Sequence, residues 1–322
     1  MILEILRKDD FALDDELLRE ISRLYYEQGC TQQEISKKVF VSRAAVSRAL
    51  EEARQRGIVE IIIHYPYENH TDLEQQLIRR FSLRSAIVNN DANMLTSESY
   101  MAVCQMAARE MNRQLNNSTV MSISRGRTTK NIIQAFVPSR TLPDMELVQL
   151  CGAHEEDDPA MFEESDHIRM LQNKLNCKSW CMFVPGLLES KELRNMLVSR
   201  KSASITLSKA KDVNYLCLSV TTLEQWKRWL TPSQIASLRR KGAVGNLLGY
   251  FFDENGQILD SKLYERWIIA DRCVFQAEQR VLVVADSFKA QAACAALNGK
   301  LANSIITTGK VARKILALHQ NP

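Results

Sequence analysis

The chain has 322 residues, of which 45% are hydrophobic and 25% charged, and these values exclude the disordered and fibrous classes of protein. The net charge of +4 permits binding to nucleic acid without indicating it, because the informative signal is positive charge gathered on one element. No signal peptide or run of about 20 apolar residues is visible, and the eight cysteines lack zinc-ligand spacing. We therefore expect a soluble cytoplasmic protein of two domains with reduced thiols, no membrane partner, no metal and no cofactor.

Three short helices are predicted within residues 14–56. Apolar residues recur at helical spacing in the first helix, and Gly29 ends it. The second helix begins at Thr31 with the capping-box pattern Thr-Gln-Gln-Glu, whose outer side chains satisfy free backbone N–H groups at a helix start. Ser42 is the N-cap of the third helix, which runs to about Gln55. This arrangement, with Phe40 in the turn before the last helix, predicts a helix-turn-helix.

The third predicted helix carries small residues and hydrogen-bond donors on one face. A helix that enters the major groove of DNA needs an N-cap able to touch phosphate, small residues for close approach, and donors for base edges. The candidate DNA-binding residues there are Ser42, Arg43, Ala44, Ser47 and Arg48. On the preceding helix, the candidates for contacts with the phosphate backbone are Gln32, Gln33, Lys37 and Lys38. The alternative is an ordinary three-helix bundle whose charged face is only solvated.

A domain boundary is expected shortly after the third helix. The β-branched run Ile58–His64 predicts a strand, and residues 66–70 predict a linker. A second capping-box pattern, which begins at Thr71, predicts the helix that follows. We therefore assign residues 1–65 to the DNA-binding domain and residues 66–322 to a second domain.

The remainder of the chain alternates predicted strands and helices. The strands are expected at residues 85–88, 120–124, 146–150, 215–219, 281–285 and 304–307, and the helices at 96–115, 127–136, 165–176, 190–200, 288–298 and 309–318. Alternation of this kind is typical of a mostly parallel sheet with helices on both faces. The predicted fold class is therefore α/β: an all-α helix-turn-helix domain followed by a doubly wound, mostly parallel sheet domain.

The loops after the predicted strands hold glycines, hydroxyl groups and cations. Ligands of open α/β sheets bind beyond the carboxyl ends of the strands, where helix N-termini also favour anions. The candidate effector-binding residues are Gly126, Arg127, Thr128, Thr129, Gly152, Asp286, Lys289 and Thr308. The loop that contains Arg127 and two threonines at a helix start suits a phosphate or a similar anion. For each loop taken alone, the alternative is turn chemistry with a helix cap.

The segment from Ile21 to Ile61 closely resembles the N-terminal domain of the SorC family of sugar-responsive bacterial transcriptional regulators. The matching motifs are Tyr-Tyr, Gly-x-Thr-Gln-Gln-Glu-Ile, Val-Ser-Arg and Arg-x-x-Gly-Ile-Val. The resemblance implies that the residues from Ser42 to Arg48 form the recognition helix and that the partner is double-stranded operator DNA. It also implies self-association as a dimer or tetramer, because such proteins use paired half-sites.

The second domain resembles SorC-type effector domains, which are similar to sugar-phosphate isomerases turned into sensors. The matching loops are Gly126-Arg-Thr, Leu150-Cys-Gly-Ala, Gly242-Ala-Val-Gly-Asn, Phe251-Phe-Asp-Glu-Asn-Gly, Asp286-Ser-Phe-Lys and Thr307-Thr-Gly-Lys-Val-Ala. This resemblance implies a phosphorylated sugar or a similar effector, and it adds Arg266 as a candidate residue.

The same loops depart from the family pattern. Asn246 replaces an acidic residue, Asp286 and Ser287 replace a double glycine, and Thr308 and Gly309 replace an acidic pair. Asp286 adds negative charge where an anionic ligand is expected. Either the ligand differs from the usual phosphorylated sugar, or the pocket has lost its ligand.

Three functions follow from these patterns. The favoured one is a DNA-binding regulator of a carbohydrate or related catabolic operon, controlled by a small effector. The second is an isomerase-like enzyme, which needs a positioned acid–base pair. His154 is the histidine near a predicted strand end, although a loop position without catalytic role is the favoured interpretation of it. The third is a regulator that has no small-molecule ligand.

Overall fold

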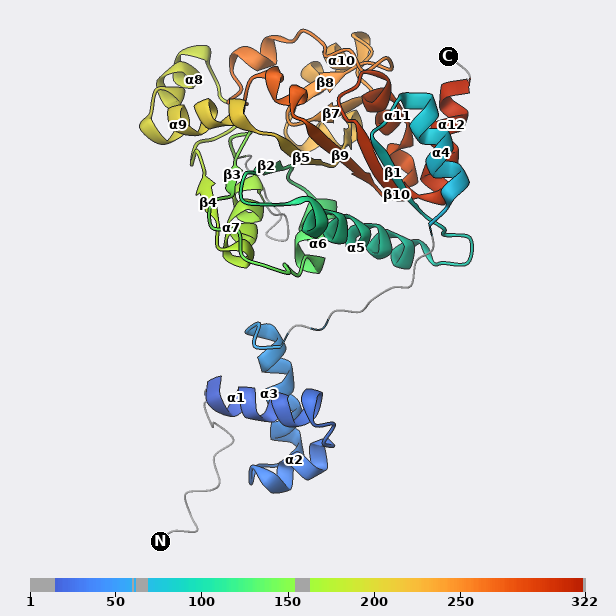
Figure 1. Ribbon diagram of the computed structural model, residues 1–322. Coiled ribbons are helices and arrows are strands. Elements are labelled where there is room, and N and C mark those ends of the chain that lie inside the picture. The colour runs from blue at the N-terminus through green and yellow to red at the C-terminus, as the bar shows by residue number, and fades with distance from the viewer. Residues whose placement is uncertain (1–14, 60, 62–68, 154–162, 321–322) are drawn as a thin grey trace. The chain divides into compact units, whose positions relative to one another are not determined.

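The computed structural model describes residues 15–59, 61, 69–153 and 163–320 (Figure 1). Contacts divide the chain into two compact units, Met1–Ile63 and His64–Pro322. The predicted boundary between residues 65 and 66, and most of the predicted linker, lie outside the described residues. Each unit is described by itself below.

The first unit is a small helical domain. Its elements are α1 (Asp15–Ser22), the π-helical turn η1 (Arg23–Glu27), α2 (Gln32–Lys38) and α3 (Arg43–Gln55). The core of the unit consists of Leu18, Ile21, Leu24, Ile35, Val46, Ala49, Leu50 and Ala53. Both predicted caps are confirmed: the Thr31–Glu34 capping box is complete, and Ser42 Oγ accepts a hydrogen bond of 3.1 Å from the Ala45 backbone.

The predicted strand Ile58–His64 is wrong where it can be tested. Ile58 and Val59 lie in a bend, and Ile61 has no regular structure. The Val59 N–H donates to the Ala53 carbonyl at 3.1 Å, and Gly57 has a φ of 71°. The chain therefore folds back over the end of α3 instead of extending, as a glycine-containing helix end favours. Residues 60 and 62–64 lie outside the described residues.

The second unit is built on a seven-stranded parallel sheet. The strands are β1 (Ser85–Asn89), β2 (Val120–Ile123), β3 (Glu146–Val148), β4 (Lys178–Trp180), β5 (Tyr215–Leu218), β9 (Gln279–Val284) and β10 (Ser304–Thr308). Their order is β1-β10-β9-β5-β2-β3-β4, with all neighbours parallel. The chain runs outward in both directions from the pair β2 and β5, so the topological switch point lies between these strands. The doubly wound α/β prediction is confirmed.

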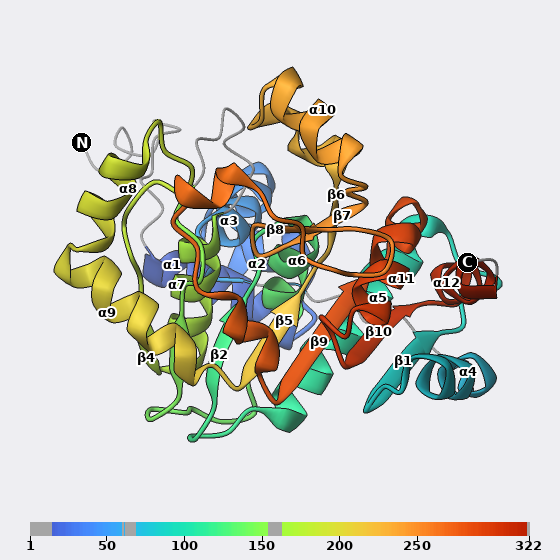
Figure 2. The same ribbon diagram turned by 90° about the horizontal axis from the view of Figure 1, so that it is seen from above.

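Helices cover both faces of this sheet (Figures 1 and 2). They are α4 (Thr71–Phe81), α5 (Thr96–Gln114), α6 (Arg127–Ala135), α7 (Glu164–Leu175), α8 (Lys191–Val198), α9 (Lys201–Lys209), α10 (Pro232–Arg240), α11 (Ala290–Asn298) and α12 (Gly309–Gln320). Side chains alternate between two cores along β9, since Val281 and Val283 pack with α5, α6 and α7 while Leu282 and Val284 pack with α4, α11 and α12. Strands buried on both faces explain the almost continuous apolar runs in the sequence.

Several short elements were not predicted. They are β4, the helices α9 and α10, and an antiparallel sheet of β6 (Thr221–Thr222), β7 (Gly245–Leu247) and β8 (Tyr250–Phe252). The 3-10 turns are η2 (Ala210–Asp212), η3 (Leu223–Arg228), η4 (Lys262–Glu265), η5 (Arg272–Gln276) and η6 (Ser287–Lys289). The capping box predicted at Thr71 is wrong. Glu74 Oε1 accepts a hydrogen bond from the Val88 backbone N–H at 2.9 Å and not from the start of its own helix.

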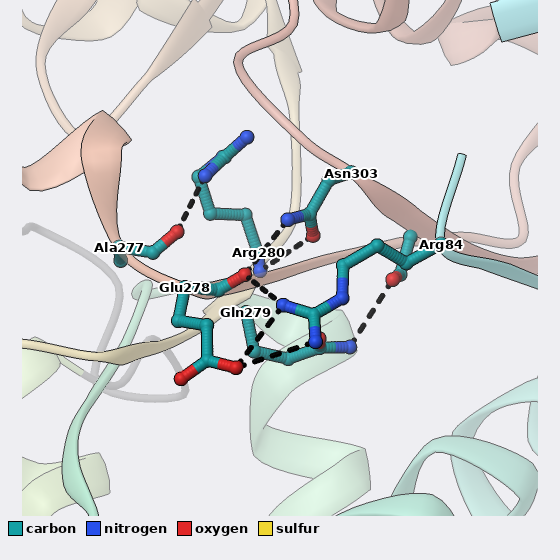
Figure 3. A network of polar contacts seen from close by, with 7 residues as sticks. Arg84, Ala277, Glu278, Gln279, Arg280 and Asn303 are labelled. Carbon is teal, nitrogen blue, oxygen red and sulfur yellow. Dashed lines mark hydrogen bonds and ion pairs between the residues drawn. The ribbon is translucent and has the colours of Figure 1, made fainter. Parts of the chain in front are cut away.

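Polar side chains close the amino ends of β1, β9 and β10 (Figure 3). The Arg84 guanidinium donates to the Glu278 carbonyl at 2.8 Å and also contacts the Glu278 carboxylate. Asn303 donates to the same carbonyl and accepts from the Arg280 backbone N–H. The polar groups at the amino ends of these three strands are therefore hydrogen-bonded to one another. The predicted site loops lie at the opposite, carboxyl ends of the strands.

Candidate DNA-binding surface and effector site

The third helix has one buried and one exposed face. Val46, Ala49 and Leu50 are buried in the core of the first unit. The candidate residues Arg43, Ala44, Ser47 and Arg48 are all exposed, as is the N-cap Ser42. The capping hydrogen bond fixes the start of the helix, so two arginines, two hydroxyls and a small side chain form one outward face. Such a face has the donors and the close approach that a major-groove surface requires.

The candidates on α2 lie at its two ends. Gln32, Gln33 and Arg43 line a surface hollow of about 630 Å³, so the structure brings these three predicted residues together. Lys37 and Lys38 are exposed at the other end of α2, just before the turn into α3. Lys38 Nζ lies 3.3 Å from Cys30 Sγ. Cations and amides therefore flank the exposed face of α3.

The switch point of the sheet holds a small internal cavity. The Ser219 N–H donates to Ser124 Oγ at 2.9 Å, which ties together the ends of β5 and β2. Ser124, Ser219, Asn246 and Arg125 are among the residues that line a cavity of about 40 Å³. Arg125 is held by an ion pair of 3.0 Å with Glu163 and lies over the ring of Trp229. A volume of this size holds about one water molecule and no sugar.

Two predicted residues from distant loops meet beside this point. Arg127, at the start of α6, has a guanidinium nitrogen 3.6 Å from an Asp286 carboxylate oxygen beyond β9. The Arg127 side chain is 69% exposed, and its guanidinium lies 5.4 Å from the ring centre of Tyr100. Lys289 is only 7% exposed, and its backbone N–H donates to the Asp286 carbonyl at 3.0 Å. Its Nζ lies 6.0 Å from the ring centre of Phe288, and among the described residues its side chain makes no hydrogen bond or ion pair. Burial lowers the pKa of Lys289, while Asp286 opposes that shift.

The two threonines of the α6 loop are buried. Thr128 Oγ1 accepts from the Tyr100 hydroxyl at 3.2 Å. Thr129 Oγ1 donates to the Gly126 carbonyl at 2.9 Å. Gly126 has a φ of 124°, a value that side chains disfavour, and no side chain caps α6. The two hydroxyl groups thus make hydrogen bonds inside the protein and stabilise the loop. The backbone N–H groups at the start of α6 have no side-chain cap.

A larger hollow of about 340 Å³ lies at the carboxyl ends of β1, β9 and β10. Its lining includes Thr308, Ser287 and Arg313, together with Asp91, which the sequence reasoning missed. An Asp91 oxygen accepts from the Lys310 backbone N–H at 3.1 Å, so this carboxylate occupies the anion-favouring start of α12. Thr308 Oγ1 accepts from the Val311 backbone at the same helix start.

Gly152 and Arg266 have structural contacts that account for them. A Cβ atom on Gly152 would lie 2.6 Å from the Pro185 carbonyl oxygen, so the glycine permits close packing of two loops. Arg266 donates to the carbonyls of Leu188 and Glu189 at 3.1 Å each. No hydrogen bond or ion pair of the described residues joins either one to Arg127 or Asp286. The assignment of these two candidates to the effector site therefore stays a prediction.

Helix α7 carries two buried titratable groups near the switch point. The Glu164 carboxylate accepts from Ser122 Oγ and from the backbones of Leu150 and Cys151. Burial raises the pKa of Glu164 to about 7 in spite of these bonds. Burial lowers the pKa of His167 to about 4, and its Nδ1 lies 3.2 Å from the Ser124 carbonyl oxygen. The alternating strand–helix pattern gave no signal for either group.

Within the described ranges, no group of three or more histidine, cysteine, aspartate or glutamate side chains is placed to hold a metal ion. None of the helices described is both long and apolar enough to cross a bilayer.

A family model described as "Putative sugar-binding domain" matches residues 65–317, which is most of the chain. The chain belongs to this sugar-binding domain family. A second model, for winged helix-turn-helix DNA-binding, matches residues 13–60. The DNA-binding model thus matches the first, helical unit, and the sugar-binding model matches the second, α/β unit.

Several proteins named as transcriptional regulators align with this chain over nearly their whole length. The sorbitol operon regulator of Klebsiella pneumoniae is 24% identical over 313 residues, which cover 94% of this chain and 98% of that protein. The transcriptional regulator LsrR of an Enterobacter species is 26% identical, with 95% and 94% covered. The crystal structure of full-length SorC from K. pneumoniae has a TM-score of 0.73 at 23% identity, with 94% and 99% covered. The resemblance to the SorC family is confirmed, and these relatives are regulators by name.

Proposed function

We propose that this regulator binds operator DNA through the exposed face of α3. The observation that carries the proposal is the sorting of α3 into a buried apolar face and an exposed face bearing Arg43, Ser47 and Arg48. Arginine pairs with guanine through two hydrogen bonds, and serine accepts more than one base. Gln32, Gln33, Lys37 and Lys38 supply the flanking phosphate contacts. The protein acts in the cytoplasm, where its operator is.

The effector of this regulator binds at the carboxyl edge of the seven-stranded sheet. Lys289 supports this assignment, because its side chain is 7% exposed and has only the charge of Asp286 and the ring of Phe288 near it, without a hydrogen bond to its ammonium among the described residues. Burying a cation in this way is costly, and a bound anion lowers the cost. An anionic group of a ligand between Lys289, Arg127 and the start of α6 supplies one. The hollow of about 340 Å³ beside Thr308 has room for a small sugar-like body.

The effector controls DNA binding without being converted. The acid–base groups described near the site are engaged internally, since Glu164 accepts three hydrogen bonds and the low pKa of His167 keeps it neutral. His154 lies outside the described residues. The regulator self-associates, as a dimer or tetramer, so that two α3 helices reach paired half-sites. A ligand shifts such an assembly only by binding two of its arrangements with different affinity.

The experiment is a selection of duplexes from a random library with the full chain, followed by footprinting of the selected duplex. The same duplex is then titrated in the presence of pentose and hexose phosphates and of the matching free sugars. We expect a protected palindromic site and a change in affinity with at least one sugar phosphate. If no duplex is enriched, the DNA-binding assignment fails. If a duplex is bound but no compound changes its affinity or the melting temperature, the regulator has no such effector.

A further inference from the structure

Phe40 is the most exposed large apolar side chain of the described residues, at 92%. It lies in the turn between α2 and α3, with a φ of 55°. A left-handed backbone is costly for a bulky residue, and an exposed ring is costly in water. Phe40 carries both costs, and neither the caps nor the core of the first unit explains them.

The turn holds Phe40 in this conformation from both sides. Ser36 Oγ donates to the Val41 carbonyl at 2.6 Å, and the Val41 N–H donates to the Ser36 carbonyl at 3.2 Å. The flanking side chains Val39 and Val41 pack against the core of the unit. With its neighbours turned inward and its backbone fixed, Phe40 is presented outward as a preformed contact.

The surroundings of Phe40 are cationic. Lys37 and Lys38 end α2 just before it, and Ser42 and Arg43 begin α3 just after it, all four exposed. A protein partner that covers an apolar ring usually supplies an apolar surface, whereas this ring stands among groups that attract phosphate. The surface of DNA beside each phosphate is the C–H face of a deoxyribose, which an aromatic ring covers well.

We propose that Phe40 contacts DNA, with its ring packed on a deoxyribose of the operator backbone next to the groove that α3 enters. The proposal rests on the DNA-binding function proposed above. Because the contact is with sugar and involves no charge, it adds affinity at every sequence and leaves the salt dependence of binding unchanged. Loss of an arginine–phosphate contact has the opposite signature, since it lowers the salt slope by about one ion.

The test compares full-length F40G, F40L and F183G on the duplex selected by the unaltered chain. Phe183 is the matched control, because it is 75% exposed with a φ of 52° but lies in the second unit. Glycine accepts positive φ, so neither glycine variant should lose thermal stability. We expect F40G to bind the duplex about tenfold more weakly with an unchanged salt slope, F40L to retain most of the affinity, and F183G to retain all of it.

Three results would overturn the proposal. The first is F40G binding with unaltered affinity. The second is an equal loss in F183G, which would make the effect unspecific. The third is a change in the oligomer size of F40G, by sedimentation, that accounts for its weaker binding, since the ring would then be covered by a second copy of the chain. Failure of the unaltered chain to select any duplex would instead refute the proposed DNA-binding function and, with it, the contact of Phe40 with DNA.

Discussion

Arg127 and Asp286 form an ion pair of 3.6 Å between the start of α6 and the loop after β9. The carboxylate therefore lies beside the cation that the sequence assigns to an anionic effector. The Asp286 side chain is 17% exposed, so water screens the ion pair only partly. If the proposed effector site is right, Asp286 competes with an anionic ligand for Arg127, and this competition can be measured.

Replacing Asp286 with asparagine should tighten the binding of a sugar phosphate. D286N removes the competing charge and keeps the shape, so we expect about tenfold higher affinity by calorimetry. Asp212, an exposed carboxylate of η2, provides the control variant D212N, whose affinity should not change. Weaker binding by D286N would mean that the carboxylate holds a ligand hydroxyl directly and would contradict the competition.

Removing the charge of Lys289 should stabilise the ligand-free protein and abolish the binding of an anionic ligand. K289M keeps the length of the side chain and removes a largely buried charge whose ammonium makes no hydrogen bond among the described residues, so the ligand-free protein should gain about 1–3 kcal/mol. The stabilisation that a sugar phosphate gives should disappear in the same variant. Urea unfolding with and without ligand measures both. A variant that is less stable, or that keeps its response to the ligand, would show that Lys289 is not the anion partner.

Glu164 and His167 should give opposite pH dependences. The raised pKa of Glu164 makes the fold less stable as pH rises from 4.5 to 7, because the folded state must release a proton that the unfolded state lost earlier. The lowered pKa of His167 makes the fold less stable as pH falls from 6.5 to 4. Between pH 4.5 and 6.5 the two slopes cancel.

H167Q removes the pH dependence of stability that is due to His167, so that the opposite dependence due to Glu164 becomes measurable. The stability of this variant, relative to the unaltered chain, should fall by about 2–3 kcal/mol from pH 4.5 to 6.5. E164Q should show a relative rise over the same range. Urea midpoints of the second unit measure both differences. Parallel pH profiles for all three proteins would refute the assigned directions of the pKa shifts.

Gly152 should prove to be a packing residue. In G152A the new methyl group would lie 2.6 Å from the Pro185 carbonyl and 2.8 Å from the Gly186 Cα, so backbone must move. We expect a loss of about 2 kcal/mol or more in unfolding free energy, with ligand affinity of the folded protein unchanged. Unaltered stability with weakened ligand binding would restore Gly152 to the effector site.

Local patterns predicted the long elements of this fold well. Caps and apolar periodicity placed α2 and α3, because these signals act within one or two helical turns, and the alternation of strands and helices placed α5 and α12. The strand β4 and the small sheet of β6, β7 and β8 have two or three residues per strand, too few to show a period. The capping box at Thr71 failed because Glu74 takes a partner on β1, which no local pattern reveals.

The candidate site was predictable only in part. Strand ends and loop composition indicated Arg127, Asp286, Lys289 and Thr308 separately, and the fold brings Arg127 and Asp286 into contact. Asp91 gave no signal, because its role depends on β1 lying next to β10 in the sheet. Gly152 fitted a ligand loop by composition, although close packing of two loops explains it.

The most direct measurement compares the operator affinity of R43A/R48A with that of R19A/R23A across a range of salt concentrations. Both full-length variants lose two positive charges from the first unit, but only the first loses them from the exposed face of α3. We expect R43A/R48A to bind the selected duplex at least about 100-fold more weakly, and R19A/R23A to bind within about threefold of the unaltered chain. Equal affinity of R43A/R48A and the unaltered chain would contradict the assignment of α3 as the DNA-reading helix.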